Sequence, residues 1–422
     1  MNKCFYVKFK SDIPKYIQIA NNIKLLIEKK IIDDEEKLPT IRNYAEFLCV
    51  NKITIINAYK KLVNDGYAYQ KVGSGTYAKR KDIISSFRRK YSKTFKKLTT
   101  ESMEDIIDFT GETTKEVIFP IDDFKEVINS VLDRDGAEAL ISQHQFGYEG
   151  LRQTICKVFW KNIVAVEDIL IVSGAQQGID VASKAILNIN DNVIVEKPTY
   201  GGAISVFKWR KANIFEVPME DDGVNIEVFE EVIKKNNIKC FYTMSYFQNP
   251  TGASYSYEKK IKLLEFAEKY DFYIIEDDYL SELIYDRDVN YKSFRALDKN
   301  DRVIYIKSFS KIFLPGIRIG YIISPKCFKE SMQNSKINTD ITTSSLMQRA
   351  LEMYISDGKW RKNIAFQKEE YRKRYNNMME SIDKELNSLI EYHKPGGGLN
   401  FYLKLKSNDI SSEELFFKLA DR

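Results

Sequence analysis

The stretch Ser308–Tyr321 (SFSKIFLPGIRIGY) is the part of the sequence from which the fold can be inferred. It follows Val303-Ile304-Tyr305-Ile306, a β-branched and aromatic run typical of a buried strand, so Lys311 is predicted on the loop leaving that strand. Hydroxyl side chains flank the lysine on one side, and a proline-glycine turn with Arg318 follows it. Such a loop suits a lysine whose amine reacts with an aldehyde that carries a phosphate. A solvated surface lysine is the alternative interpretation of this stretch alone.

The composition of the chain is that of a globular protein. Its 422 residues are 44% hydrophobic and 30% charged, enough sequence for two or three domains with a buried core. No apolar run approaches the roughly 18 residues of a membrane span, and the polar start lacks a signal-peptide core, so a cytoplasmic location is predicted. The five cysteines lack paired spacing and there are two histidines, which disfavours disulfides, a metal site and a Ser-His-Asp triad.

The net charge is divided unevenly along the chain. Residues 1–100 contain 22 lysines and arginines against 9 aspartates and glutamates, a net charge of +13. The whole chain carries +5, so the remainder carries −8. The N-terminal part therefore suits a polyanionic partner and the rest does not.

The basic N-terminal part shows the pattern of a small helical module. Pro14–Lys30 has apolar residues at helical spacing, and Thr40 can cap a short helix that runs to Leu48. After a turn, Lys52–Asn64 forms a second amphipathic segment, and two short helices joined by a tight turn describe a helix-turn-helix. Tyr67–Ala78 alternates and turns at glycines, as a two-stranded wing does.

Three motifs in this order, LPTIR at 38–42, AY…L…DG at 58–66 and GSGTY at 73–77, resemble the GntR-type winged helix-turn-helix. The resemblance implies DNA binding, with the second helix of the motif in the major groove. It implies DNA-side positions for Thr40, Arg42, Lys52, Thr54, Gly73, Ser74 and Gly75. Ile53 and Ile56 stand where relatives often have polar base-reading residues, so the identity of the sequence-reading side chains stays open. A winged helix used for protein contacts is the alternative.

Composition shifts divide the chain into three parts: a DNA-binding domain at 1–79, a basic linker at 80–104 and a large domain at 105–422. The linker is dense in lysine and arginine without sustained periodicity, which is typical of a solvated tether. Its charges can also add nonspecific attraction to phosphates. In the large domain, apolar runs alternate with helical segments, which predicts an α/β fold with a mostly parallel sheet.

Five segments of the large domain follow predicted strands and carry polar or aromatic residues. They are 173–178 (SGAQQG), 197–201 (KPTYG), 249–252 (NPTG), 276–279 (EDDY) and the stretch around Lys311. Open α/β sheets bind ligands at the carboxyl ends of their strands, so one site built from these five segments is the economical interpretation. A small-residue turn that opens a helix, as at 173–178, is an anion site, although any tight strand-helix turn prefers small residues.

This ordered set resembles the fold type I aminotransferases, which bind pyridoxal 5'-phosphate. The resemblance implies that Lys311 is the Schiff-base lysine and that Asp277 pairs with the pyridine nitrogen. It also implies that Asn249 and Tyr279 bond the ring hydroxyl and that Tyr200 stacks on the ring. The implied phosphate ligands are Ala175, Gln176, Ser308, Ser310 and Arg318. A turn, a helix cap and a core aromatic are the structural alternatives for these fragments taken singly.

The C-terminal subdomain, from about residue 330, is expected to be incomplete. Residues 363–387 predict a long charged helix, and Pro395–Leu403 resembles the glycine turn and strand that open this subdomain in the family. Relatives continue further and supply an arginine for a substrate carboxylate. No residue of this chain can be assigned that role.

A GntR-type winged helix joined to an aminotransferase-like domain resembles the MocR/GabR family of bacterial transcriptional regulators. The resemblance implies a non-enzymatic regulator that binds a double-stranded DNA operator and responds to pyridoxal phosphate, or to an amine or amino-acid effector at the Schiff base. It also implies a homodimer with a domain-swapped, head-to-tail arrangement. An active aminotransferase with an accessory DNA-binding domain is the alternative, and a repressor that senses the cofactor itself is a third.

Overall fold

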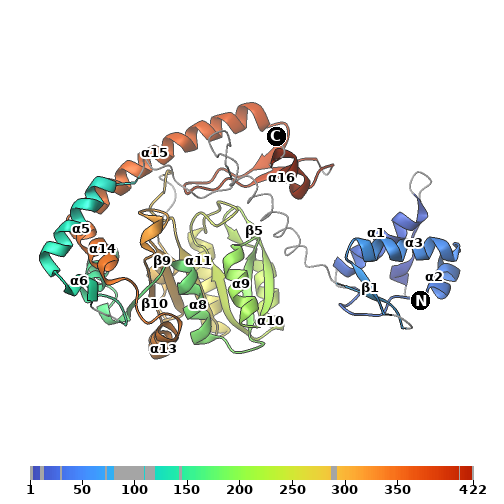
Figure 1. Cartoon of the computed structure of the whole chain (residues 1–422), viewed down its shortest axis with the longest axis horizontal. Helices are drawn as coiled ribbons and strands as arrows, with labels where there is room; N and C mark the ends of the chain where they lie inside the picture. The colour runs from blue at the N-terminus through green and yellow to red at the C-terminus, as the bar shows by residue number, and fades with distance from the viewer. Residues whose placement is uncertain are drawn as a thin grey trace. The chain divides into compact units, whose positions relative to one another are not determined.

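The computed structural model describes residues 3–9, 14–28, 31–71, 74–79, 109, 119–141, 145–286, 292–407 and 409–420 (Figure 1). The predicted linker at 80–104 lies outside these residues. The chain divides into two compact units, one formed by Met1–Phe109 with Asp409–Arg422 and the other by Thr110–Asn408. Within the described residues, no helix is long and apolar enough to cross a membrane.

The N-terminal part of the first unit has the predicted helices and wing. Its elements are η1 (Lys3–Phe5), α1 (Lys15–Glu28), α2 (Ile41–Leu48), α3 (Lys52–Asn64), β1 (Ala68–Lys71) and β2 (Gly75–Ala78), and α16 (Ser412–Ala420) is the C-terminal element of the same unit. Thr40 caps α2 by accepting a hydrogen bond from the Asn43 amide at 3.3 Å. Asn51 caps α3 by accepting one from the Ile53 amide at 2.9 Å. These caps explain why both helices begin where the sequence predicts.

The apolar faces of α1, α2 and α3 form the core of this unit, with Ile23, Ile55 and Leu62 almost fully buried. Two buried tyrosines satisfy their hydroxyls on backbone carbonyls. Tyr44 donates to Phe5 at 3.0 Å, and Tyr59 donates to Pro39 at 2.6 Å, which ties α3 to the turn before α2. The helix-turn-helix is therefore held together by its own buried side chains.

The second unit alternates helices and strands. Its first half contains α5 (Ile121–Asp135), α6 (Glu138–Ile141), α7 (Glu149–Trp160), η4 (Val166–Asp168), β3 (Ile169–Val172), α8 (Ala175–Ile186), β4 (Asn192–Lys197), α9 (Gly201–Trp209), β5 (Asn213–Glu220), β6 (Gly223–Val224), α10 (Ile226–Lys235) and β7 (Ile238–Thr243). Its second half contains α11 (Tyr257–Lys269), β8 (Tyr273–Asp278), α12 (Phe294–Leu297), β9 (Val303–Ser308), η5 (Pro315–Ile317), β10 (Gly320–Ile323), η6 (Lys326–Phe328), α13 (Lys329–Thr339), α14 (Ser345–Ser356), α15 (Lys359–Ser381), the π-helical turn η7 (Ile382–Leu386), β11 (Ile390–Tyr392) and β12 (Leu403–Leu405).

The central sheet has the order β3-β10-β9-β8-β7-β4-β5-β6. Strands β9, β8, β7, β4 and β5 run parallel to one another, whereas β10 is antiparallel to both β3 and β9, and β6 is antiparallel to β5. The predicted α/β class and mostly parallel sheet are confirmed. The carboxyl ends of β3, β4, β7, β8 and β9 share one edge, so the residues that follow them converge.

Two boundaries differ from the prediction in ways that matter for the site. Helix α8 begins at Ala175, inside the segment 173–178 that the sequence predicts as a turn. Strand β8 extends through Asp278, so Asp277 lies in the strand and not after it. β8 is central and pairs with β7 and β9 through these acidic residues, for example Asp277 with Ile306, and buried hydrogen-bond partners compensate their charge.

Helices cover both faces of the sheet (Figure 1). Along β9, Ile304 and Ile306 pack under α8 and α9, whereas Tyr305 faces the cluster formed with α7, α14 and α15. Gly178 lets α8 pack tightly on the sheet, because a Cβ there would come within 2.6 Å of the Ile306 side chain. This close packing brings the first turn of α8 to the edge where the strands end.

Candidate functional site

A cavity of about 120 Å³ lies at the carboxyl edge of the sheet. Its lining residues are Ala175, Gln176, Tyr200, Met244, Asn249, Asp277, Tyr279, Ser308, Ser310, Lys311 and Arg318. All ten residues that the sequence assigned to the cofactor line this cavity, and Met244 is the addition. The structure thus brings together five segments that lie far apart in the chain, and the roles of these residues toward a ligand remain predictions.

Asp277 is the acidic residue among those that line the cavity. It is 3% exposed, and its Oδ2 accepts a hydrogen bond from the Tyr242 hydroxyl at 2.8 Å. Its Oδ1 is buried and has no hydrogen-bond partner among the residues that the structure describes. Burial raises the pKa of Asp277 to about 7, although the hydrogen bond from Tyr242 acts in the opposite direction. A buried carboxylate oxygen without a hydrogen-bond donor destabilises the folded protein, so a ligand that supplies a donor to this oxygen would be bound favourably.

The neighbouring Asp278 has the opposite surroundings, because successive side chains of a strand point to opposite faces. Lys307 pairs with Asp278 at 3.1 Å and with Glu282 at 2.7 Å, and the Tyr305 hydroxyl donates to Asp278 at 2.7 Å. Burial alone would raise the pKa of Asp278, but Lys307 and these hydrogen bonds hold it below its usual range. Asp278 is thus neutralised inside the fold, and Asp277 is the carboxylate left for the cavity.

The opposite end of the cavity is built for an anion. Gly174 caps α8 with φ of 94°, and no side chain caps the first amides of the helix, where the positive end of the helix dipole lies. Arg318 donates from Nη2 to the Ser173 carbonyl at 3.2 Å and from Nη1 to the Ser310 hydroxyl at 3.3 Å. A Cβ at Gly174 would come within 3.0 Å of the guanidinium, which explains the glycine.

The charge of Arg318 is available to a ligand. Among the residues that the structure describes, its hydrogen bonds go to neutral oxygens and it forms no ion pair with a carboxylate. The Ser310 amide donates to the Ser308 hydroxyl at 3.2 Å, which fixes the loop that carries Lys311. A guanidinium, two hydroxyls and the start of a helix form a site that suits a phosphate.

The side walls of the cavity are aromatic and held by their own hydrogen bonds. Tyr200 donates to the Gln176 side-chain oxygen at 3.1 Å. The Tyr279 hydroxyl donates to the Phe247 carbonyl at 2.8 Å and accepts from the Asn400 amide at 2.9 Å. The predicted hydrogen bond from Tyr279 to a ring hydroxyl would therefore compete with the Phe247 carbonyl for the tyrosine proton.

Glu196 is a buried residue that the sequence analysis missed. Its Oε1 accepts hydrogen bonds from the Thr243 hydroxyl at 2.6 Å and the Tyr255 hydroxyl at 2.9 Å, and its Oε2 accepts from Gln248 at 2.9 Å. Gln248 also donates to the Pro198 carbonyl at 2.7 Å. Burial raises the pKa of Glu196 to about 7 in spite of these donors. The carboxyl joins the loop that carries Tyr200 to the loop that carries Asn249.

The sequence analysis also missed Tyr242. Both Glu196 and Tyr242 could have been recognised from the sequence, because each is a polar residue inside an otherwise apolar strand. A buried polar side chain needs a partner, so such a residue in a strand core points to an internal network. Met244 and Asn400 carried no comparable signal. Asn400 reaches the cavity wall through its contact with Tyr279, which lies 121 residues away.

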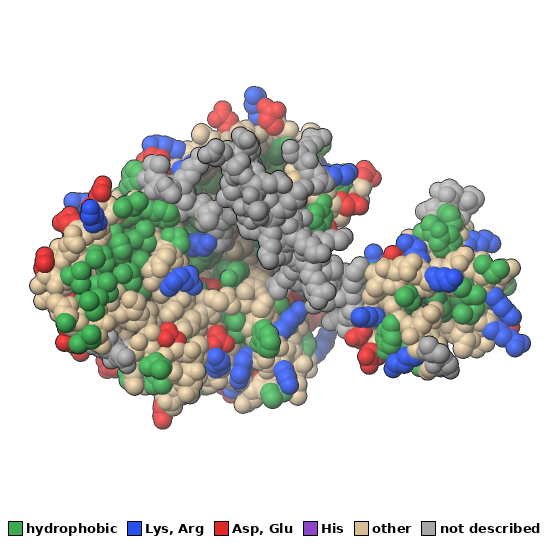
Figure 2. Space-filling view, in the orientation of Figure 1, with side chains coloured by type: hydrophobic (Ala, Val, Ile, Leu, Met, Phe, Trp, Pro, Cys, Tyr) green, Lys and Arg blue, Asp and Glu red, His purple; other side chains and the backbone are tan. Residues whose placement is uncertain are grey.

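The second unit also exposes an apolar surface. Figure 2 shows hydrophobic side chains gathered over the region of α5, α6 and α14, where Ile121, Leu140 and Ile141 are more than half exposed. A hollow of about 480 Å³ lined by Phe119, Phe124, Leu314, Pro315, Gly316, Ile317 and Met347 adjoins the loop of Lys311. Exposed apolar surface of this kind is typical of protein contacts.

On the first unit, the predicted DNA-side residues lie around the start of α2 and α3. The Arg42 side chain is 76% exposed and its Nε pairs with Glu46 at 3.1 Å. Lys52 is exposed in the first turn of α3, and Thr54 is half-buried in the same turn. Ile53 is 62% exposed between them. The Thr40 hydroxyl acts as the α2 cap, so its acceptor is already used inside the protein.

The predicted wing is the antiparallel hairpin of β1 and β2, with Lys71 opposite Gly75. Gly75 has φ of 129°, and the Ser74 hydroxyl lies 2.6 Å from the Tyr77 hydroxyl. The Lys71 ammonium stands 4.9 Å from the centre of the Tyr77 ring. Gly73 lies outside the described residues. The hairpin thus presents a cation beside its turn, as a wing that contacts phosphates requires.

Known proteins match this chain either over most of its C-terminal three quarters or over nearly its whole length. The family profile described as "Aminotransferase class I and II" matches residues 114–422. Aromatic-amino-acid aminotransferase 1 of Thermococcus litoralis is 30% identical over 303 residues, which cover 70% of this chain and 72% of that protein. A Bacillus subtilis protein named "Uncharacterized HTH-type transcriptional regulator YdfD" is 29% identical over 430 residues, which cover 97% of this chain and 88% of that protein.

Among solved structures, LysN of Thermus thermophilus, an alpha-aminoadipate aminotransferase complexed with N-(5'-phosphopyridoxyl)-L-leucine, matches with a TM-score of 0.70 and 27% identity. The match covers 77% of this chain and 82% of that one. The cavity described above fits a phosphopyridoxyl group. The unpartnered Oδ1 of Asp277 can accept a hydrogen bond from a protonated ring nitrogen, and the Arg318 end can hold the phosphate.

Proposed function

The chain belongs to the class I and II aminotransferase family, and we propose that it is a DNA-binding transcriptional regulator of the MocR/GabR type, not a metabolic enzyme. Its cofactor is pyridoxal 5'-phosphate. The observation that carries the proposal is the combination of a basic winged helix-turn-helix and a cofactor cavity in one chain, together with a regulator-named relative that matches 97% of it. Transamination by itself does not require a winged helix-turn-helix.

Pyridoxal phosphate, when bound, supplies an aldehyde that reacts with primary amines and a ring that withdraws electrons while its nitrogen is protonated. In the proposal, the Lys311 amine holds the aldehyde and Asp277 keeps the proton on the ring nitrogen. Arg318, the hydroxyls of Ser308 and Ser310 and the amides of Ala175 and Gln176 hold the phosphate. Tyr200 covers the ring face and excludes water from it.

The effector in this proposal is a small amine or amino acid. The amine of such an effector would compete with the Lys311 amine for the aldehyde, and Lys311 is the residue whose side chain would be freed by this competition. If the two states of the cavity favour different conformations of the protein, cofactor and effector change the affinity for DNA, and DNA changes theirs by the same factor.

A homodimer extends the proposal to the operator. Two copies present two basic modules, which can bind two half-sites whose spacing follows from the symmetry of the dimer. The apolar surface around α5 and α14 supports a protein contact of the second unit. A domain-swapped, head-to-tail arrangement is the form proposed for this dimer.

The test uses the full chain with and without pyridoxal phosphate. Binding sites are selected from a random duplex library, and the affinity for the selected DNA is then measured against salt concentration and against a panel of amines and amino acids. We expect affinity that falls steeply with salt and changes when the cofactor or one amine is added. Equal affinity under all ligand conditions would contradict the sensing role.

An active aminotransferase with an accessory DNA-binding module is the second candidate. The cavity contains both Lys311 and Asp277, and the Thermococcus relative carries an aminotransferase name, which favours this candidate. Steady turnover of an amino acid and a keto acid at about 1 per second or faster, without DNA binding, would establish it over the regulator. A change of DNA affinity with pyridoxal phosphate alone would instead point to a sensor of the cofactor.

A further inference from the structure

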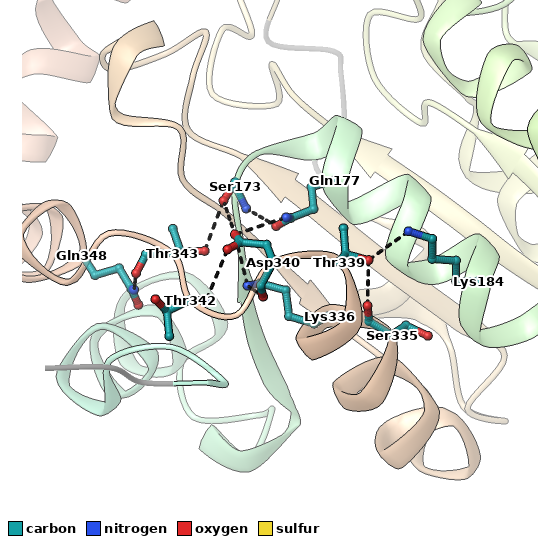
Figure 3. Close-up of polar contacts among 10 residues, drawn as sticks. All are labelled: Ser173, Gln177, Lys184, Ser335, Lys336, Thr339, Asp340, Thr342, Thr343 and Gln348. Atoms are coloured by element: carbon teal, nitrogen blue, oxygen red, sulfur yellow. Dashed lines mark hydrogen bonds and ion pairs between the residues drawn. The ribbon is translucent and has the colours of Figure 1, made fainter.

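A polar cluster lies behind the phosphate end of the cavity, where the segment between α13 and α14 passes the start of α8 (Figure 3). Its centre is Asp340. The Oδ2 atom of Asp340 accepts hydrogen bonds from the Ser173 hydroxyl at 3.1 Å and from the Gln177 side-chain amide at 3.3 Å. Both partners belong to the turn that opens α8, more than 160 residues away in the chain.

Asp340 remains ionised in this position. Burial alone would raise its pKa, but the hydrogen bonds from Gln177 and Ser173 and the charge of Lys336 hold the pKa below its usual range. The Lys336 side chain is 1% exposed, pairs with the carboxylate at 3.4 Å and donates to the Asp340 carbonyl at 2.9 Å. The charge of Asp340 is therefore balanced within the cluster, and the charge of Arg318 is left for a ligand.

The cluster fixes the turn from two sides. The Gln177 side-chain oxygen accepts from the Ser173 amide at 2.6 Å, while its nitrogen donates to Asp340, so the orientation of this amide group is determined. The Ser173 carbonyl in turn accepts from Arg318 at 3.2 Å. A chain of contacts thus runs from Asp340 through Ser173 to the guanidinium and to the first turn of α8. Asp340 itself does not line the cavity.

We propose that Asp340 is a positioning residue for the phosphate end of the cofactor site, acting through Ser173 and Gln177 on Arg318 and on the first amides of α8. A carboxylate suits this position because its oxygen can accept from a hydroxyl and an amide at once. The Oδ1 atom of Asp340 also accepts a hydrogen bond from the Thr342 amide at 3.2 Å. An asparagine here would turn its side-chain nitrogen either toward Ser173 and Gln177 or toward the Thr342 amide, and that nitrogen cannot accept a hydrogen bond from any of them. The inference rests on the pyridoxal phosphate site of the proposed function and not on DNA binding.

The test compares two aldehydes that differ in the phosphate. Pyridoxal phosphate and pyridoxal are titrated into the cofactor-free full chain, and binding is followed by the visible absorption of the lysine-bound aldehyde. Asp340→Asn is expected to weaken pyridoxal phosphate about tenfold and to leave the affinity for pyridoxal within about twofold. Asp180→Asn is the matched control, because Asp180 also belongs to α8 but pairs with Lys184 near the surface. The affinities for pyridoxal phosphate and for pyridoxal should both stay unchanged in this variant.

A second variant keeps the test decisive if Asp340→Asn fails to fold. Ser173→Ala removes the hydroxyl contact to Asp340 and should reduce the preference for the phosphorylated aldehyde by a few fold. When combined with Asp340→Asn, it should have little added effect, because the two side chains act together. Equal weakening of both aldehydes, or an unchanged preference in both variants, overturns the inference while the proposed function stands. A wild-type protein without any preference for the phosphorylated aldehyde overturns both the inference and the cofactor assignment.

Discussion

Arg318 in the second unit and Arg42 in the first differ in how their side chains are held and in which groups they contact. Arg318 is fixed by the Ser310 hydroxyl and the Ser173 carbonyl, and its charge is left without a carboxylate partner among the described residues. Arg42 stands 76% exposed on α2 and pairs with Glu46 one turn away. The first arrangement suits a small ligand that enters one fixed position. The second suits a polyanion that can displace a weak surface ion pair.

The carboxylates repeat this contrast. In the second unit, burial raises the pKa of Asp277 and of Glu196, whereas Lys307 and hydrogen bonds hold the pKa of the equally buried Asp278 below its usual range. In the first unit, the acidic loop 33–36 and Glu46 are exposed. Substitutions around the cavity should therefore have large effects that depend on geometry and pH, whereas those on the surface proposed to contact DNA should have small effects that depend on salt.

The largest expected effect is the loss of the covalent link to the cofactor. Lys311→Ala should abolish the visible absorption that the wild-type protein shows after loading with pyridoxal phosphate, because within the described part of the chain no other amine lines the cavity. Lys299→Ala, an exposed lysine after α12, is the control and should keep the spectrum. An unchanged spectrum in the Lys311 variant would show that the reactive lysine lies elsewhere.

Asp277 should make the cofactor-free protein less stable as pH rises. Burial raises its pKa from 3.8 to about 7 in the folded chain, so the folded state binds this proton more tightly than the unfolded state does. The stability that it contributes is complete below about pH 4 and is lost as pH rises to about 7. The side chain of the Asp277→Asn variant does not titrate. Between pH 5 and pH 8 the free energy of unfolding of this variant should therefore fall by about 2 to 3 kcal/mol less than that of the wild type.

Thermal unfolding midpoints of both cofactor-free proteins at the two pH values test this difference. Glu196 and Glu276, whose pKa values burial also raises, titrate in both proteins, so their contributions cancel in the comparison. The same pH dependence in wild type and variant would mean that Asp277 is ionised in the folded protein at pH 5, with a partner for its Oδ1.

A smaller effect is expected at the phosphate end. Gly174→Ala places a Cβ about 3.0 Å from the Arg318 guanidinium at a φ of 94°, so the guanidinium must move away from the Ser173 carbonyl. Pyridoxal phosphate should bind about tenfold more weakly and pyridoxal nearly unchanged. Gly136→Ala is the matched control, because Gly136 also has positive φ (55°) but a Cβ there meets nothing within 4 Å. A loss of equal size in both variants would assign the effect to backbone strain.

The sequence predicted best those features that depend on neighbouring residues. Thr40 and Asn51 are caps, and each fixed the start of its helix because the cap and the helix it serves are adjacent in the chain. The strand ends were predictable for a related reason, since a β-branched run followed by a glycine or proline turn is a local signal. The convergence of the five segments then follows from the parallel sheet.

The contacts that hold the cavity in place could not be predicted. Asp340 and Ser173 are 167 residues apart, and Asn400 and Tyr279 are 121 apart, and nothing in the local pattern at either member of a pair indicates the other. The extension of β8 through Asp278 was missed because acidic residues normally end a strand. Here Lys307 and Tyr305 on the adjacent strand compensate the charge of Asp278.

The smallest effect, and the one that sharpens the comparison of the two arginines, concerns Arg42. Arg42→Ala should weaken binding to the selected DNA only a few fold at moderate salt, because one phosphate contact among several is lost and the ion pair with Glu46 already offsets part of the charge. The slope of log affinity against log salt should fall by about 1, uniformly across DNA sequences.

Glu46→Gln provides the opposite change at the same place. It frees Arg42 from its partner and removes a negative charge from the DNA-facing side, so affinity should rise by a few fold and the salt slope should become steeper. If Arg42→Ala instead changed the preferred DNA sequence, or abolished binding at all salt concentrations, Arg42 would be a fixed contact to a base. It would then resemble Arg318, and the difference drawn here between an exposed, screened surface and a preorganised cavity would not hold for this residue.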